Sequence, residues 1–391
     1  KFEYGEDNGK LLSVEQWGDQ VWGSMQQTFY YCSNMIINAT DVPDLTGVTN
    51  MSGMFYEATA FNQNIGGWNV SNVTNMSSMF NQATSFNQAI GGWDVSKVTN
   101  MSFMFYEAAS FNQDIGSWNV GSVTDFSYLF YDATNFNQDI GLWDVKNVTN
   151  MFFMFKGLKD FDQDISNWNV SNVTKMDYMF YDASAFNQDI GNWDVSNVTN
   201  MDDMFLGATQ FNGAIGNWNV GNVTSMKGMF LNAKSFDQNI GSWNVGGVTD
   251  MISMFRGATS FNQNIGSWDV SKVTDMRYMF DDSGLSASNY DNLLNGWSDL
   301  SLQSNVSLNA GNSAYCNGAA ARQKIIDDFG WTITDAGQEC PFVTTWKTDN
   351  PGKTDANSIE IPTGDGTFAY TVDWGDGSTD TTVYTGDATH T

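Results

Sequence analysis

The chain has 391 residues, of which 41% are hydrophobic, so an ordered core is expected and disorder is excluded for most of its length. Its 44 acidic residues outnumber the 16 basic ones and give a net charge of -28, which disfavours binding to nucleic-acid phosphates. No apolar run approaches the roughly 20 residues needed to span a bilayer. With a start at Lys1 that lacks an apolar leader, these features predict a soluble, processed or excised piece without a membrane span.

Histidine is nearly absent, which bears on catalysis. His390 is the only one, so no Ser/His/Asp triad, Cys/His pair or multi-histidine metal site can be assembled. Most enzyme classes are therefore excluded, and we expect no enzymatic activity. Hydrolysis by carboxylates alone remains open.

Residues 1–40 are expected to form an N-terminal strand, KFEY, and a capping coil. Met25 and Cys32 each lie 26 residues ahead of positions in the first regular repeat, Met51 and Ala58. This offset predicts a degenerate first coil that caps the array. It also places Cys32 on an inward-facing column, where we expect a free, buried thiol.

Residues 41–284 contain ten repeats with a period of 25 residues. One tryptophan position recurs without insertion or deletion: Trp68, Trp93, Trp118, Trp143, Trp168, Trp193, Trp218, Trp243 and Trp268. Val, Phe and Ile columns keep the same step, and a Met-x-x-Met-Phe run follows each Val-Thr pair. We expect these columns to form the core rather than a cofactor site.

The apolar pattern changes along each repeat. Trp68 and Val70 alternate, as in a short strand, whereas Met76, Met79, Phe80 and Ala83 follow the spacing of one or two turns of α-helix or 3₁₀ helix. One coil cannot bury its own apolar edge, so the coils must stack. The pattern therefore predicts a solenoid of short strands and helical turns.

Residues 285–340 break the period and are expected to form a C-terminal cap of helices and a strand. Residues 341–391 change to alternating Thr, Asp and Gly, as in YTVDWGDGSTD, and predict the start of an incomplete antiparallel β module. The three carboxylates Asp373, Asp376 and Asp380 are weak candidates for holding Ca²⁺ there, and turn formation by Asp-Gly is the preferred interpretation. No other cofactor is expected.

The repeat FNQDIGNWDVSNVTNMDDMF, residues 186–205, closely resembles the 25 to 26-residue repeat of BspA-like bacterial surface proteins, a branch of the leucine-rich repeats. The resemblance covers roughly residues 10–340. It implies a right-handed, leucine-rich-repeat-like α+β solenoid, a secreted or cell-surface location on a bacterium, and a role in adhesion without enzymatic activity. YTVDWGDGS resembles PKD-like β sandwiches, so the trailing module is expected to be a partial sandwich.

Adhesion and rigid spacing are the predicted functions, and we expect the chain to be one period of a longer tandem protein. The expected partners are a host or environmental surface protein, a glycan, or another copy of the chain. A glycan-binding module or a carboxylate glycoside hydrolase is the alternative. Ice binding by the threonine rank from Thr49 to Thr274 is a remote one.

A candidate binding surface lies at positions that the repeat leaves free. Four consecutive coils have an aromatic residue two positions after the first Met, and three of them have a tyrosine three positions later, with Lys156 interrupting. Mutual packing between coils is the competing interpretation. The seven residues expected to form one ligand-binding patch are Phe103, Tyr106, Tyr128, Tyr131, Phe153, Tyr178 and Tyr181. Glu107, Asp132, Asp177 and Asp182 would form an acidic rim.

Two further features have structural interpretations. Secreted proteins permit disulfides, and Cys316 and Cys340 bracket the predicted cap, so we expect a bridge between them. The Asn column that includes Asn62 and Asn87 resembles the asparagine ladder of leucine-rich repeats, which satisfies backbone groups at a tight corner.

Overall fold

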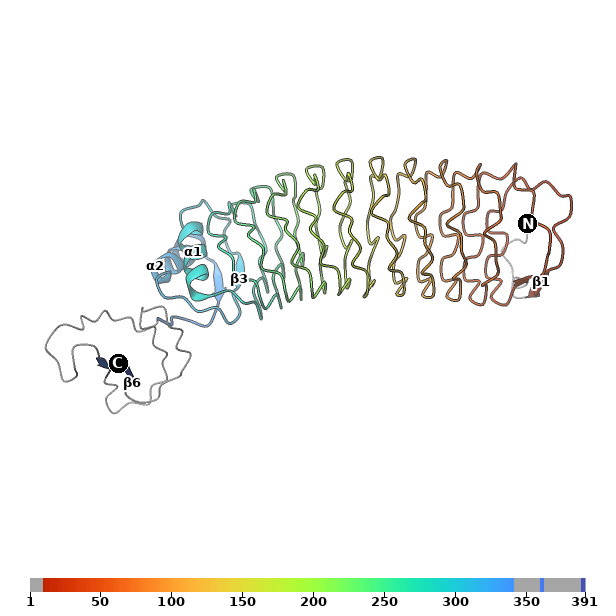
Figure 1. Ribbon diagram of the computed structural model, residues 1–391. Helices are drawn as coiled ribbons and strands as arrows, with labels where there is room; N and C mark the ends of the chain where they lie inside the picture. Colours follow the sequence, from red (N-terminus) through yellow and green to blue (C-terminus); the bar gives the residue numbers. More distant parts are fainter. Residues whose placement is uncertain (1–9, 341–358, 362–387, 391) are drawn as a thin grey trace. The chain divides into compact units, whose positions relative to one another are not determined.

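The computed structural model describes residues 10–340, 359–361 and 388–390, and the chain divides into two compact units between Cys340 and Pro341. The first unit is a row of stacked coils (Figure 1). Helices α1 (Ala287–Trp297) and α2 (Ala319–Phe329) lie at its C-terminal end. Among the described residues no helix combines the length and the apolar character that crossing a bilayer requires.

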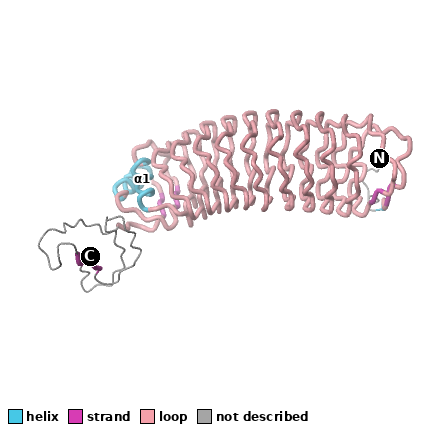
Figure 2. The backbone as a smooth tube through the Cα atoms, viewed as in Figure 1, coloured by secondary structure: helices cyan, strands magenta, loops and turns pink. Residues whose placement is uncertain are grey.

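Turns and isolated bridges, rather than strands and helical turns, build the repeats (Figure 2). Parallel bridges join equivalent residues of successive coils, such as Asn50 to Asn75 and Asn75 to Asn100. Most backbone N–H groups of the Met-x-x-Met-Phe run donate to the next coil or three residues back, and that of the second residue donates to a side chain two residues back, as Ser77 does to Asn75 Oδ1. None of these bonds spans the four residues that an α-helix requires. Residues 41–284 thus contain turns and single bridges in place of regular helices and strands, and the fold class, a right-handed, leucine-rich-repeat-like solenoid, stays a prediction.

The core runs through the middle of the coil stack. The repeated Trp, Val, Met, Phe, Ile and Ala positions are all buried, most of them completely. Phe80 and Phe105, for example, stack with ring centroids 5.7 Å apart. Each tryptophan from Trp93 to Trp268 also donates its indole N–H to an Ile carbonyl of the preceding coil, as Trp118 does to Ile90 at 3.1 Å. The indole nitrogen is thereby satisfied where it is buried.

Polar columns bond the coils at their corners. Asn62 Oδ1 accepts the backbone N–H of Asn87 at 2.9 Å and the side-chain amide of Gln88 at 3.0 Å, and the same pattern continues along the column. This is the backbone role expected of the asparagine ladder. On another edge, the Thr74 hydroxyl donates to the Thr49 carbonyl at 3.1 Å, and most later threonines repeat this bond. The threonine hydroxyls are thus bonded to the protein backbone.

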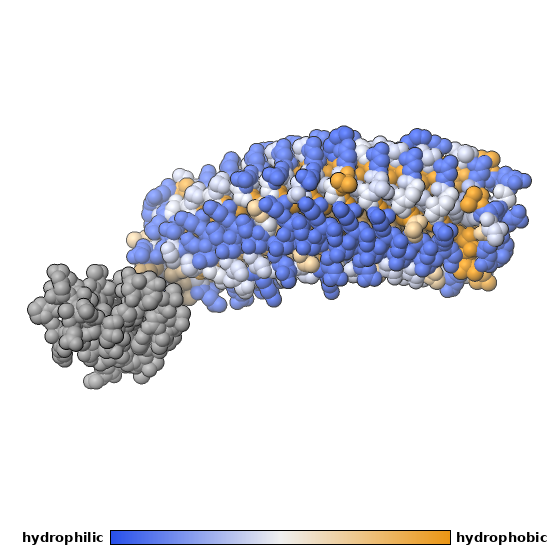
Figure 3. Space-filling view, viewed as in Figure 1, coloured by the Kyte–Doolittle hydropathy of each residue, from blue (hydrophilic) through white to orange (hydrophobic). Residues whose placement is uncertain are grey.

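The N-terminal end of the stack is a partly regular coil. β1 (Ser13–Val14) pairs in parallel with β2 (Ile36–Ile37). Cys32 is buried and free, and burial raises the pKa of its thiol to about 11. Most of the face shown in Figure 3 is hydrophilic. Among the described residues, several large apolar side chains are nevertheless exposed near the N-terminal end, such as Leu12 at 64% and Val42 at 61%, and Leu142 is 91% exposed in the middle of the array.

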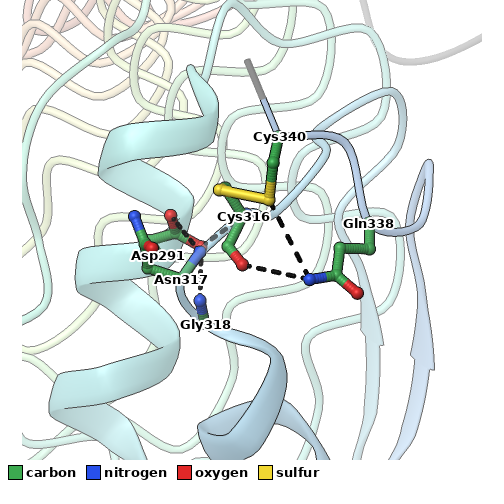
Figure 4. The surroundings of a disulfide bond; sticks show 6 residues. All are labelled: Asp291, Cys316, Asn317, Gly318, Gln338 and Cys340. Carbon is green, nitrogen blue, oxygen red and sulfur yellow. Dashed lines mark hydrogen bonds between the residues drawn. A yellow bond between two sulfur atoms is a disulfide. The ribbon is translucent and has the colours of Figure 1, made fainter. Parts of the chain in front are cut away.

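The C-terminal end is closed by α1, β3 (Ser307–Asn309), α2 and β4 (Thr332–Thr334), with β3 parallel to β4. Ser286 caps α1 by accepting the N–H of Asn289. The buried Asp291 carboxylate accepts the N–H groups of Asn317 and Gly318 at 2.8 and 2.7 Å, where its charge favours the start of α2 (Figure 4). A disulfide joins Cys316 to Cys340, with Cα atoms 4.7 Å apart.

Little of the second unit is described. β5 (Ile359–Ile361) pairs antiparallel with β6 (Ala388–His390). The KFEY strand, most of the predicted PKD-like module and the calcium candidates Asp373, Asp376 and Asp380 lie outside the described residues. The assignment of this unit as PKD-like stays a prediction.

Candidate functional site

The Met-x-x-Met-Phe run places two kinds of side chain on opposite faces of one turn. In the coil from Met76, the N–H of Ser78 donates to Ser102 at 2.8 Å in the next coil, and the N–H of Met79 donates back to Met76 at 3.2 Å. The third residue of this four-residue turn, Ser78, has a φ of 55°. A positive φ at that position is what a type II turn requires. The Met and Phe residues are buried, and the third residue is less so.

Every coil repeats this left-handed residue, which we call the first outer rank: Gln27, Gly53, Ser78, Phe103, Tyr128, Phe153, Tyr178, Asp203, Gly228, Ser253 and Tyr278. Four consecutive members are aromatic, as predicted. Their rings form a continuous stack, with centroid distances of 4.3 Å from Phe103 to Tyr128, 5.2 Å from Tyr128 to Phe153 and 4.3 Å from Phe153 to Tyr178. All four side chains are half-buried.

The second outer rank comprises Tyr106, Tyr131, Lys156 and Tyr181, three residues further along each turn. Tyr106 and Tyr131 stack at 4.4 Å, and Tyr131 lies 5.7 Å from Tyr128 of the first outer rank. Lys156 continues the stack: its Nζ lies 4.3 Å from the Tyr131 ring centroid and 5.8 Å from that of Tyr181. The seven predicted residues therefore come together, although they pack on one another and are half-buried rather than fully exposed.

Carboxylates border the two outer ranks. Asp132 Oδ2 lies 2.6 Å from Lys156 Nζ. Burial acts to lower the pKa of Lys156, but the hydrogen bonds and electrostatic effects of Asp132 and Tyr131 together outweigh it, so the pKa is raised and the ammonium form is favoured. Burial raises the pKa of Tyr106, and the neighbouring Glu107 charge raises it further. Burial and the Glu107 charge therefore both favour the protonated form of Tyr106.

Asp203 ends the aromatic stretch of the first outer rank. It is only 8% exposed, and burial raises its pKa to about 6, with a further contribution from the charge of Asp202 and an opposing hydrogen bond from Tyr178. Burial also raises the pKa of Asp177. No group of three or more His, Cys, Asp or Glu residues in the described ranges is arranged to hold a metal ion.

Three features of this surface were not predicted from the sequence. The left-handed backbone of the first outer rank was missed, because bulky aromatic residues are rare in that conformation. Lys156 was treated as an interruption, whereas its ammonium continues the stack. Asn81, at the position equivalent to Tyr106 in the preceding coil, is 6% exposed and its Oδ1 has no hydrogen-bond partner among the described residues.

A protein-family model with the description "Mycoplasma protein of unknown function, DUF285" matches the chain in three tandem segments, residues 23–142, 114–218 and 211–318. Together these segments span residues 23–318, which is more than half of the chain. No curated protein and no solved structure matches it.

Proposed function

The chain belongs to the family described as Mycoplasma protein of unknown function, DUF285, and we propose on that premise that it is a bacterial cell-surface adhesion module and rigid spacer. The three tandem matches agree with the resemblance to BspA-like surface repeats. The two outer ranks are the proposed contact surface, and their partner is a protein or glycan of a host or environmental surface.

The observation that carries this proposal is the backbone under the aromatic residues. Phe103, Tyr128 and Phe153 have φ values of 58°, 57° and 54°. Such a conformation costs a bulky residue about 1 kcal/mol or more, and Gly53 and Gly228 occupy the same rank without that cost. Stacking of two rings stabilises the fold by only about 0.5–1.5 kcal/mol per pair. These aromatic residues add little to the stability of the fold. Their presence in four successive coils is therefore better explained by a contact with another molecule.

The ring geometry favours a protein partner over a glycan. Neighbouring rings of the first outer rank are nearly parallel, with interplanar angles of 13–15°. The two middle rings, those of Tyr128 and Phe153, are therefore covered on both faces by their neighbours. Only ring edges and tyrosine hydroxyls remain to meet a partner, whereas sugar recognition by aromatic residues uses open ring faces. Tyrosine edges and hydroxyls are typical of the centres of protein contacts.

Spacing is the second part of the proposal. Backbone bonds between successive coils recur throughout the repeats, as from Thr74 N to Thr49 O at 2.8 Å and from Phe80 N to Met104 O at 2.9 Å. The buried ranks run through every coil without a break. Because each coil is fixed to both neighbours, the stack would resist bending and hold the contact surface away from its point of attachment.

A carboxylate hydrolase remains the second candidate, since the raised pKa values of Asp177 and Asp203 suit a general acid. Glycoside hydrolysis also needs two carboxyl groups facing a cleft at about 5–10 Å. Release of reducing sugar from a polysaccharide panel, lost in Asp203→Asn, would favour this candidate over adhesion.

Adhesion can be tested with beads coated with the protein and counted on protein-coated and glycan-coated glass after washing. The variant is Tyr128→Ser with Phe153→Ser, because serine occupies the same rank at Ser78 and Ser253. We expect fewer retained beads, with the larger loss on protein-coated glass. The matched control is Asn167→Ser with Asn192→Ser, two exposed positions where another coil has Ser117. Equal retention of variant and control would contradict the proposal.

A further inference from the structure

Phe152 lies beside the first outer rank and is the second residue of the Met-x-x-Met-Phe run in its coil. Its N–H donates to Asn150 Oδ1 at 3.1 Å, as the N–H of Ser77 donates to Asn75 Oδ1 at 2.9 Å. The backbone bond is thus the same with phenylalanine as with serine. Four earlier coils have serine at this position: Ser52, Ser77, Ser102 and Ser127. The fold therefore does not require an aromatic side chain there.

The Phe152 ring stands nearly perpendicular to three rings of the first outer rank, at interplanar angles of 80–85°. Its centroid lies 5.2 Å from that of Tyr128, 4.6 Å from that of Phe153 and 5.7 Å from that of Tyr178. In such a pair, the edge of one ring meets the face of the other. Both faces of Phe153 are already covered by its stacked neighbours, so its edge meets a face of Phe152. The opposite face of Phe152 points away from the stack.

The outer face of Phe152 is not covered by another ring. Its side chain is only half-buried. Among residues 10–340, the three perpendicular rings are its only aromatic contacts, and no lysine or arginine stacks on it. Phe152 therefore offers a partner a ring face, which the middle rings of the first outer rank do not.

Asp177 places a carboxylate next to Phe152. It has the same position in the following coil, and the Phe153 N–H donates to the Asp177 carbonyl at 3.3 Å, so the two backbones lie side by side. Burial raises the pKa of Tyr128 and of Tyr178, and the Asp177 charge adds to it in both cases. The carboxylate therefore lies near two of the rings that Phe152 contacts.

The protein balances the charge of Asp177 only in part. Asp177 forms no ion pair within the part of the chain that the structure describes. Burial raises its pKa and the charge of Asp202 raises it further, whereas a hydrogen bond from its own backbone and the charge of Lys175 act in the other direction without cancelling the rise. A cation supplied by a partner would stabilise the carboxylate.

Cations of the chain itself already lie on rings of this surface. Lys156 Nζ is 4.3 Å from the Tyr131 ring centroid and pairs with Asp132. The Arg256 guanidinium is 5.6 Å from the Tyr278 ring centroid. A ring with a neighbouring carboxylate therefore holds a cation elsewhere on the same surface.

We propose that an arginine side chain of a partner protein stacks on the outer face of Phe152 and pairs with the Asp177 carboxylate. A guanidinium is planar, so it can cover the ring with one face while its edge donates two hydrogen bonds to a carboxylate. A lysine ammonium is a point charge and has no such face. The net charge of -28 attracts a basic partner and repels a second copy of this chain.

This inference rests on the proposed function, in which the outer ranks contact a partner protein, and it names the chemistry of that partner. Bead retention on protein-coated glass separates the two failures. We expect Phe152→Ser to retain fewer beads than the unchanged protein. If Phe152→Ser retains as many while the Tyr128→Ser and Phe153→Ser double variant retains fewer, the inference fails and the adhesion proposal stands. If neither variant loses beads, the adhesion proposal fails.

The direct test is a titration with Nα-acetyl-arginine methyl amide, followed by NMR of ¹³C-labelled phenylalanine rings. The Phe152 signal is the one that Phe152→Ser lacks. We expect a saturable shift of this signal with a Kd of about 1 mM, as one stacked cation and one ion pair would give. The citrulline form of the probe has a similar shape and no charge, and it should bind at least about ten times more weakly. Absence of a saturable shift with the charged probe overturns the proposal, as does a shift with methyl glucoside alone.

Two variants remove the two halves of the site, and probe binding is then measured from the resonances of the probe. Phe152→Ser should weaken binding about tenfold or more, and Asp177→Asn about tenfold, because it removes only the charge. The matched control is Ile252→Ser, a half-buried apolar residue at the same position four coils further on, which should bind the probe like the unchanged protein. Unchanged binding in both Phe152→Ser and Asp177→Asn would show that the probe binds elsewhere.

Discussion

Phe130 and Tyr128 lie two residues apart in one turn, and both stack on rings of the neighbouring coils. Phe130 is completely buried, with Phe105 at 5.6 Å, whereas Tyr128 is half-buried, with Phe103 at 4.3 Å. Every coil has Phe at the inner position, but the outer position holds Gln, Gly, Ser, Asp, Phe or Tyr. The same ring stacking thus occurs in both ranks, and only the inner one is required to fill the core.

The largest expected effect comes from the inner rank. Phe130→Ala should lower the free energy of unfolding by about 3–5 kcal/mol, because it leaves a cavity beside Phe105 and Phe155 that close packing cannot refill. Denaturant unfolding followed by circular dichroism measures the loss. A loss of stability below about 1 kcal/mol would show that the buried Phe position matters no more to the fold than the first outer rank does.

A smaller effect on stability is expected at Asp203, where the first outer rank has a carboxyl group instead of an aromatic ring. The pKa of Asp203 is raised to about 6, so the folded protein binds its proton more tightly than the unfolded chain does. Its contribution to stability is complete below the unfolded pKa of about 4 and is lost as the pH rises through 6.

Asp203→Asn removes this titration. The variant should match the original protein in stability at pH 4 and exceed it by about 1–3 kcal/mol at pH 7. Unfolding midpoints in denaturant at the two pH values give the difference. A variant whose advantage is equal at both pH values, or larger at pH 4, would show that Asp203 is not held in a buried, proton-binding state.

The smallest expected effect tests the left-handed backbone itself. Gly157, in the column of left-handed residues that includes Asp132, has a φ of 75°, and an added Cβ would meet the Asp132 side chain. Gly157→Ala should lower stability by about 1–2 kcal/mol. Gly67→Ala is the control, because Gly67 has no positive φ and no atom within 4 Å of an added Cβ. Equal effects of the two substitutions would contradict the strain assigned to these columns.

The sequence was most informative where one residue type recurs in every coil. The 25-residue step identifies Phe130, Met154 and Trp168 as core residues, because only an inward position demands the same apolar side chain repeatedly. It was misleading for the turn, since the spacing of Met76, Met79 and Phe80 fits both a helical turn and the stacked turns observed. The repeat period shows which residues face inward. A helical turn and the stacked turns differ instead in which carbonyl groups accept the backbone N–H bonds, and the spacing of side chains does not reveal that.

The candidate site was only half visible in the sequence. The aromatic residues of adjacent coils could be grouped, because equal repeat positions lie side by side in any stack. The role of Lys156 could not, since it depends on the length of a side chain that lies between two rings. A positive φ under Tyr128 was equally hidden, because that conformation is normally assigned to Gly or Asn.

The central claim is that the outer aromatic rank makes contacts outside the molecule and contributes little to the fold. Unfolding free energy and bead retention, measured on one preparation of the Tyr128→Ser and Phe153→Ser double variant, test it most directly. The account predicts a loss of stability of about 1–2 kcal/mol, below that of Phe130→Ala alone, together with weakened attachment. A stability loss as large as that of Phe130→Ala, with attachment unchanged, would contradict it.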